Sequence, residues 1–169
     1  MRELCPELPR WFALTVKHQH ERPVEGVLCS GGLETFLPVF RCLRRWSDRV
    51  KELEAPLFPG YVFTRFPFRD RVRVLNTPGV ARIVGFAGRP APLEDQEIEN
   101  LRVAVSSSLP LGPWPFLKTG DRVIVRQGPL RGIEGRLVRE KSGARLVINV
   151  ELLQRSVAIE VEAAMLARA

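Results

Sequence analysis

The chain contains 169 residues, of which 45% are hydrophobic and 27% charged, and these are ordinary values for a folded globular protein. Its apolar runs fall far short of the roughly 20 residues that a membrane-spanning helix needs, and residues 1–6 lack the apolar segment of a signal peptide, so we expect a cytoplasmic protein without a membrane partner. The net charge is +7, and 22 of the 26 basic residues are arginine, which favours phosphate backbones and acidic protein surfaces as partners.

The first part of the chain alternates between strand and helix signals. Apolar stretches bounded by polar residues predict strands, at residues 11–16, 34–40, 60–64 and 80–85. Apolar residues at helical spacing predict helices, over residues 21–28, 69–76 and 94–105. The charged stretch 43–55, with Ser47 and Asp48 in its middle, predicts an exposed hairpin. Strands and helices mixed on this scale indicate an α/β (α+β) sandwich, in which helices pack against one sheet.

Two of these helices have a recognisable apolar face. We expect one set of side chains to point inward from each helix, namely Val24, Val27 and Leu28 from the first and Ile98, Leu101 and Val105 from the last.

A stretch rich in proline and glycine then divides the chain. Residues 106–115 contain three prolines, a glycine and three serines, and neither a helix nor a central strand tolerates that density of breakers. The stretch therefore predicts a linker that its prolines stiffen.

Apolar residues alternate with polar ones beyond this linker, which predicts half-buried strands. The alternating sets are Val123 and Val125; Leu146, Ile148 and Val150; and Val157, Ile159 and Val161. Turns are expected at residues 120–121, 128–129 and 142–143. Short strands at this spacing fit a small all-β barrel of five strands. The predicted domains are thus residues 1–106 and 118–169, joined by a linker over 107–117.

Two motifs are specific enough to indicate a family. The first is PLFPGYVF at residues 56–63, and the second, at residues 118–137, resembles a KOW motif. The KOW residues are Gly120, Asp121, Gly128, Pro129, Gly132 and Gly135. In this order, and across a Pro-rich linker, the motifs resemble those of the NusG family of transcription elongation factors. The resemblance extends from Trp11 to the C-terminus and implies an NGN-type domain followed by a KOW (SH3-like) barrel.

The glycines of the second motif also have a physical reading of their own. Gly128 and Gly135 are expected to adopt positive φ in tight turns, and Pro129 presets a turn conformation. Gly132 is expected to allow a close backbone approach at a bend.

The resemblance implies that the first domain docks on the clamp helices of the largest RNA polymerase subunit through a hydrophobic depression. Phe58, Pro59 and Tyr61 correspond to this depression, and we expect Phe58 and Tyr61 to present an exposed apolar face. Trp11 and Phe12 are neighbours of the depression by the same resemblance, although Trp11 is equally compatible with the core.

Basic residues near this region are candidates for nucleic-acid binding. Family members approach the non-template DNA strand, which arginines could hold through phosphates or by stacking on bases. The candidates on this side are Arg41, Arg44, Arg45, Arg69, Arg71 and Arg73. Lys17, His18, His20 and Arg22 match a region that specialised members use to read DNA. The alternative for both groups is a solvated surface.

In the barrel, Leu152, Leu153 and Arg155 resemble the segment that binds a small-subunit ribosomal protein or the termination factor Rho. The family often has an aromatic residue and a glycine where this chain has Leu153 and Gln154, which argues against Rho. Leu152 or Leu153 remains a candidate anchor for a partner.

We expect neither a cofactor nor a metal. His18 and His20 lack a thiol or carboxylate that would complete a ligand set, and Cys5, Cys29 and Cys42 form no zinc-binding pattern. The chain contains no nucleophile elbow, no HExxH motif and no P-loop, so we expect no enzyme.

The sequence thus predicts a transcription elongation and antitermination factor that binds polymerase and suppresses pausing or termination. Within the family it resembles specialised paralogs of the RfaH and UpxY type. Alternating apolar residues favour a barrel for the second domain, so we expect no switch to a helical fold. The alternative function is a ribosome- or RNA-binding KOW protein without polymerase contact. A duplex-DNA reader is disfavoured, since no helix-turn-helix is recognisable.

Overall fold

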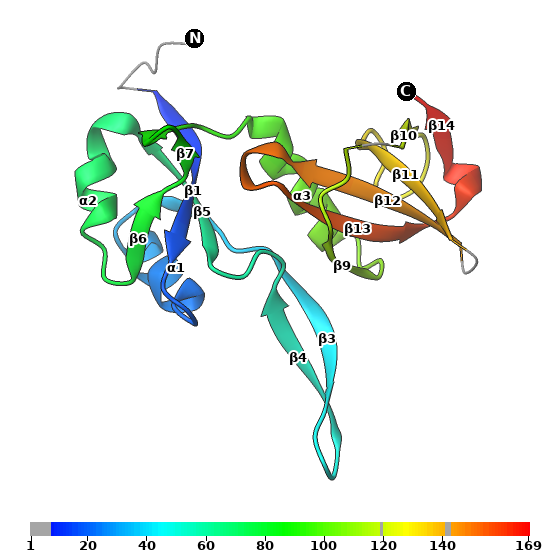
Figure 1. Cartoon of the computed structure of the whole chain (residues 1–169), viewed down its shortest axis with the longest axis horizontal. Coiled ribbons are helices and arrows are strands. Elements are labelled where there is room, and N and C mark those ends of the chain that lie inside the picture. Colours follow the sequence, from blue (N-terminus) through cyan, green and yellow to red (C-terminus); the bar gives the residue numbers. More distant parts are fainter. Residues whose placement is uncertain (1–7, 119, 141–142) are drawn as a thin grey trace. The chain divides into compact units, whose positions relative to one another are not determined.

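A computed structural model describes residues 8–118, 120–140 and 143–169 of the chain (Figure 1). The described residues form two compact units. One extends up to Leu37 and includes Phe58–Ile98, and the other combines Pro38–Leu57 with Glu99–Ala169. Cys5 and Ser142, which the sequence analysis singled out, lie outside the described residues.

A four-stranded antiparallel sheet organises the first unit, with strand order β2-β5-β1-β6. Its strands are β1 (Pro9–Val16), β2 (Glu34–Phe36), β5 (Tyr61–Pro67) and β6 (Val80–Ile83). The register pairs Ala13 with Phe63 and Thr15 with Tyr61, and a bulge interrupts the β1–β6 pairing between Thr15 and Val16. Side chains alternate between the two faces of such a sheet, so these pairs define which residues share a face.

One face is occupied by the helices α1 (Glu21–Ser30) and α2 (Arg71–Leu75), the latter preceded by the short η1 (Phe68–Asp70). The Phe12 ring on this face contacts the Phe66 and Phe68 rings, with centroids 4.7 and 6.0 Å apart. The guanidinium of Arg73 donates to the Gly31 carbonyl and so joins α2 to the end of α1. We call this face the helix-covered face.

The inward residues of α1 differ from the expectation at one position. Val24 and Leu28 are buried, whereas Val27 is 51% exposed, so its predicted inward orientation is wrong. Val24 and Leu28 are four residues apart and lie on one side of the helix, whereas the Val27 side chain is exposed to solvent.

Two further elements complete the first unit. A short two-stranded ribbon consists of β7 (Gly85–Phe86) and β8 (Arg89–Pro90). The helix α3 (Asp95–Ser106) begins in the first unit and continues in the second. Ile98, Leu101 and Ala104 are its buried residues, and Val105, which was expected inside, is only half-buried.

The second unit contains the predicted hairpin, formed by β3 (Val39–Arg45) and β4 (Val50–Pro56). The single strand expected over residues 34–40 is therefore two strands, β2 and β3. Pro38 lies between them. Because a proline has no N–H to donate to a ladder, the chain leaves one sheet there and begins another.

The second unit also contains an antiparallel sheet of six strands in the order β14-β10-β11-β12-β13-β9, which we call the C-terminal sheet. Its strands are β9 (Leu111–Trp114), β10 (Asp121–Val125), β11 (Glu134–Glu140), β12 (Gly143–Val150), β13 (Arg155–Val161) and β14 (Leu166–Arg168). Two short turns of 3-10 helix are η2 (Glu151–Leu153) and η3 (Ala163–Met165). Leu146, Ile148, Val157 and Ile159 are buried, as their alternation predicts.

Strand β9 lies within the stretch that was expected to be a linker. Its residues pair with β13 from Leu111 opposite Ile159 to Trp114 opposite Ser156. An edge strand accepts proline where a central strand does not, because only one of its sides must donate hydrogen bonds. Pro113 therefore stands inside a strand after all.

No helix in the described part of the chain is long and apolar enough to cross a membrane. The same residues contain no cluster of three or more side chains that could hold a metal ion.

Candidate functional site

The face of the first sheet that α1 and α2 leave uncovered carries Tyr61. By the strand register this face, which we call the Tyr61 face, presents every second residue of β1, β2 and β5. These residues are Trp11, Ala13, Thr15, Glu34, Phe36, Tyr61, Phe63 and Arg65. Ala13 and Phe63 are fully buried in its centre, and Tyr61 and Phe36 are half-buried.

A turn held from two sides presents Tyr61 at the start of β5. Gly60 has φ of +84°, which favours glycine. Its N–H donates to the Glu21 carboxylate at 2.8 Å, and its carbonyl accepts the N–H of Val16 at 2.9 Å. Because Glu21 begins α1 and Val16 ends β1, the turn at Pro59 and Gly60 is fixed to both elements.

Three of the aromatic residues expected at the polymerase-binding depression lie inside the protein. Phe58 is 1% exposed, so its predicted exposure is wrong; its ring packs edge-on against Phe63 at 5.7 Å. Trp11 is 3% exposed and occupies the core, and Phe12 lies on the helix-covered face. The accessible residues of the predicted set are Pro59, which is exposed, and Tyr61.

Phe36 belongs to this surface and was not among the predicted site residues. It stands opposite Phe63 across β2 and β5, and the two rings stack at 6.2 Å. Phe36 thus continues the aromatic row toward the edge of the sheet. Only the strand register shows that its aromatic ring shares a face with Tyr61.

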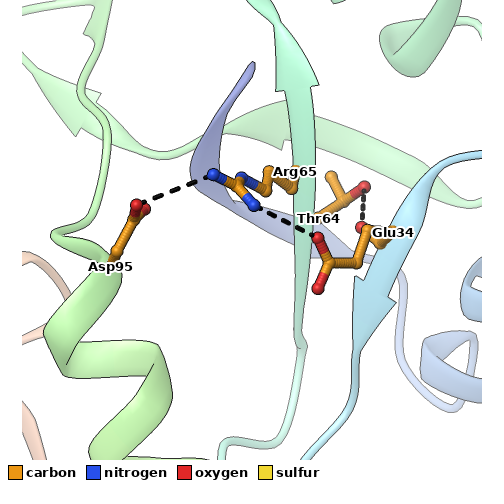
Figure 2. Close-up of polar contacts among 4 residues, drawn as sticks. All are labelled: Glu34, Thr64, Arg65 and Asp95. Carbon is orange, nitrogen blue, oxygen red and sulfur yellow. Dashed lines mark hydrogen bonds and ion pairs between the residues drawn. The ribbon is translucent and has the colours of Figure 1, made fainter. Parts of the chain in front are cut away.

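Polar residues lie at the opposite end of the Tyr61 face (Figure 2). Arg65 reaches Glu34 at 3.6 Å and Asp95 at 3.7 Å, and the Thr64 hydroxyl donates to the Glu34 carbonyl at 3.1 Å. Asp95 stands in the first turn of α3, where the helix dipole favours an acidic residue. The positive charge of Arg65 is therefore used within the fold, where it fixes the start of α3 to β2 and β5.

The loop between β1 and α1 is basic, exposed and anchored. Lys17, His18, His20 and Arg22 are all exposed. The N–H of Lys17 donates to the Gly79 carbonyl at 2.9 Å, and the His20 ring approaches the His18 carbonyl at 2.9 Å. Since Val16 bonds to Gly60 and Lys17 bonds to Gly79, this loop and the turn before Tyr61 share one end of the sheet.

The arginines around α2 make local contacts. Arg69 lies 4.0 Å from Asp70, and the Arg71 guanidinium lies over the Phe68 ring at 4.9 Å. Arg73 is bound to the end of α1, as described above. These contacts give each of the three arginines a structural role beside the predicted one.

The hairpin arginines are arranged differently. Arg41 pairs with Glu52 at 3.7 Å, but Arg44 stands directly opposite Lys51. Within residues 8–118, neither Arg44 nor Lys51 has an acidic partner. Two like charges in opposite positions destabilise a strand pair, and a bound anion would relieve the repulsion. Exposed Leu43, Trp46 and Val50 lie next to this pair, near the tip of the hairpin.

Two of the KOW glycines exchange the roles that were expected of them. Gly128 and Gly132 have φ of +83° and +89°. Gly135 lacks the expected positive φ; a Cβ there would lie 2.7 Å from the Val147 carbonyl oxygen and 2.8 Å from Leu146. The close approach expected at Gly132 therefore occurs at Gly135, because Gly135 lies within β11, beside β12. Gly120 also has positive φ, at +124°.

The candidate partner segment of the C-terminal sheet lies at η2. Leu153 is buried, Leu152 is half-buried, and Arg155 is exposed. Gln154 has φ of +51°, and its side chain donates to the Glu151 carbonyl at 2.8 Å. Gln154, where the resemblance places a glycine, thus lies in the left-handed region, and Leu152 is the accessible apolar residue of this segment.

Comparisons with known proteins agree on one family. Residues 9–102 match the family model described as NusG, transcription termination factor nusG. The transcription termination/antitermination protein NusG of Lactococcus lactis is 27% identical, over 90% of this chain and 89% of that protein. The protein of the same name from Campylobacter jejuni is 24% identical, over 90% and 93%.

A solved structure concerning domain interaction in Thermotoga maritima NusG has a similar fold. It is 18% identical, covers 95% of this chain and 97% of its own, and superposes with a TM-score of 0.56. The predicted fold class, an α/β NGN-type part followed by an all-β part, is thereby confirmed. The family match also confirms a transcription termination/antitermination factor rather than an enzyme. Because the family model covers more than half of its length, the chain belongs to the NusG family.

Proposed function

We propose that the Tyr61 face binds RNA polymerase at the clamp helices of its largest subunit. The observation that carries this proposal is the aromatic row of Phe36 and Tyr61, half-exposed on a rigid sheet whose entry turn is fixed by Glu21 and Val16. Half-exposed aromatics on a preorganised surface are efficient anchors, because little conformational freedom is lost on binding. Phe58 and Phe63 support the row from below, and Trp11 and Phe12 act through the core.

Binding of this kind suppresses pausing without chemistry. A ligand that binds the closed clamp more tightly than the open one lowers the open fraction. A difference of about 1.4 kcal/mol between the two affinities changes that ratio tenfold. The chain would thus act as an elongation and antitermination factor.

We also propose a contact with the non-template DNA strand. Arg44 and Lys51 on the hairpin, together with Arg45, supply positive charge beyond what the described acids of the hairpin neutralise, and the exposed Trp46 adds a ring for base stacking. The anchored loop with Lys17, His18, His20 and Arg22 is a second candidate. The contacts of Arg41, Arg69, Arg71 and Arg73 within the fold make them weaker candidates.

The remaining organisation follows the family pattern. We propose residues 1–106 as the polymerase-binding domain, 107–117 as the connection and 118–169 as the KOW domain, which recruits a ribosomal or termination-related protein through Leu152, Leu153 and Arg155. The departure at Leu153 and Gln154 supports a specialised paralog over the housekeeping member. Such a factor works in the cytoplasm.

Capture of purified RNA polymerase by the tagged full-length chain tests the main proposal. We expect the double variant Phe36→Ala with Tyr61→Ala to lose at least tenfold in affinity. Val27→Ala, which removes an exposed apolar side chain from α1, serves as the matched control and should bind normally. Equal capture by all three proteins would reject the Tyr61 face. No capture by any of them, combined with tight RNA binding, would favour a ribosome- or RNA-binding protein instead.

A further inference from the structure

Strand β9 pairs with β13 along one of its edges, and Pro113 lies on the other edge. The N–H of Glu160 donates to the Pro110 carbonyl at 3.0 Å, and Gly112 and Trp114 stand opposite Ala158 and Ser156. Backbone groups alternate in direction along an antiparallel strand, so positions 110, 112 and 114 face β13, and positions 111 and 113 face away. Pro113 therefore removes an N–H from the outer edge of β9 and none from the pairing with β13.

Side chains hold this segment at two further points. The Arg145 guanidinium lies over the Trp114 ring at 4.9 Å and is itself held by Glu140 at 3.5 Å and Glu160 at 3.6 Å. Farther along, the Asn149 amide donates to the Leu117 carbonyl at 2.8 Å, and the Ser156 hydroxyl donates to Asn149 at 2.6 Å. Residues 110–117 are thus anchored along β12 and β13.

Apolar residues are also buried on the face of the C-terminal sheet that carries Trp114. Val147 and Ala158 stand opposite each other on the face that does not carry Ile148 and Ile159, yet they are buried as well. The register places Trp114 on this second face. Loss of the segment would therefore remove the Trp114 ring from this face and uncover the backbone groups of β13.

The segment is also the weakest strand of the sheet by its composition. β9 has four residues, and glycine and proline occupy its centre, whereas β12 and β13 are long and rich in branched residues. A short edge strand of this kind is released long before the strands beside it. An uncovered β13 would be a template for the addition of another extended chain.

We propose that residues 110–117 act as an edge guard, which occupies the outer edge of β13 in competition with an extended segment of a partner protein. The partner segment would place a small residue opposite Ala158 and an aromatic residue beneath Arg145, as Gly112 and Trp114 do. This inference rests on the proposed function only in that the C-terminal sheet recruits a partner. The guard prevents the addition of another strand in two ways. β9 occupies the outer edge of β13, and Pro113 leaves no N–H donor at the centre of the outer edge of β9.

Amide hydrogen exchange of the full-length chain tests the guard. Gly112→Pro removes an N–H that faces β13, so we expect exchange at Ala158 and Glu160 to rise at least tenfold while Val147 stays protected. Pro113→Ala is the matched control: its nitrogen faces away from β13, and exchange at Ala158 should not change. If exchange at Val147 also rises in Gly112→Pro, the variant has lost more than β9, and Trp114→Ala then serves as the test. Trp114→Ala leaves every backbone donor in place, and we expect a smaller rise in exchange at Ala158 and Glu160.

Binding of a synthetic peptide with the sequence of residues 109–118 tests the edge itself. We expect it to bind Gly112→Pro and restore protection at Ala158, and to bind the unsubstituted chain at least tenfold more weakly. Unchanged exchange in both β9 variants, or equal peptide binding to both chains, would overturn the proposal. Gly112→Pro should capture polymerase as well as the unsubstituted chain does, because the substitution does not touch the Tyr61 face. If the unsubstituted chain itself captures no polymerase, that result counts against the proposed function and not against the edge guard.

Discussion

Glycine is required for one of two physical reasons at individual positions of this chain: a positive φ, or the lack of space for a side chain. Gly60 and Gly132 have positive φ in open surroundings, so only backbone strain opposes a side chain there. Gly135 has ordinary φ but lies against β12, so contact with Val147 and Leu146 opposes a side chain. The residue that is tolerated best as a replacement therefore differs between the two kinds of position.

We therefore expect asparagine and alanine to rank in opposite order at Gly132 and Gly135. Asparagine tolerates the left-handed region, so Gly132→Asn should be less destabilising than Gly132→Ala, which costs about 1–2 kcal/mol. At Gly135 the larger side chain should be the worse one. Urea denaturation of the four variants measures the ranking, and the same order at both positions would contradict it.

Glu25 is a carboxyl group whose surroundings disfavour its charge. Burial raises its pKa above the usual 4.5, although Arg22 and a backbone hydrogen bond from Leu37 act in the opposite direction. A raised folded-state pKa means that this group stabilises the fold below pH 4.5, and that the contribution is lost as pH rises through the folded pKa. We expect Glu25→Gln to raise the melting temperature relative to the unsubstituted chain at pH 7 but not at pH 4. Thermal denaturation at both values measures this, and an equal difference at both would contradict it.

At the scale of elements, the hairpin β3–β4 shows how strand register creates a site. The sequence shows only a run of basic residues, and the register then separates them: Arg41 pairs with Glu52, whereas Arg44 stands opposite Lys51. The hairpin thus carries a local excess of positive charge close to an exposed tryptophan.

Lys51→Glu should convert this repulsive pair into an attractive one and weaken binding of single-stranded DNA. The affinity should fall several-fold at low salt, and the salt dependence should become shallower by about 0.7 for each phosphate that the hairpin no longer neutralises. Lys51→Gln, which removes the charge without adding an acid, should lie between the two. Fluorescence anisotropy with a labelled oligonucleotide at several salt concentrations measures the series. Identical affinities would remove the hairpin from the nucleic-acid interface.

Prediction from sequence succeeded where a single periodic pattern decides the structure. The alternation of Leu146, Ile148 and Val150 predicted a strand, and the spacing of Ile98 and Leu101 predicted a helix, because side-chain direction follows from spacing alone. It failed where a tertiary contact decides the structure. The Phe58 ring is buried with its edge against Phe63, and β9 forms because β13 offers an edge. Neither partner can be recognised from local spacing.

At the scale of the whole molecule, our proposal assigns two binding surfaces to one basic chain. The Tyr61 face is apolar at one end, and at the other end Glu34 and Asp95 neutralise the charge of Arg65. The net charge of +7 therefore resides on other parts of the chain. Polymerase capture should therefore be less sensitive to salt than DNA binding, since burial of apolar surface is not screened by ions. Titration of both interactions over the same range of salt concentrations compares them, and parallel losses would contradict this division.

The docked segment has a consequence for reach. With residues 110–117 held on β12 and β13, only residues 107–109 separate α3 from the held segment, and three residues span at most about 10 Å. Once undocked, residues 107–117 extend to about 40 Å. A partner that displaced β9 and bound the C-terminal sheet would thereby lengthen the connection between α3 and that sheet about fourfold. The volume that the bound partner can reach would grow with the cube of that length.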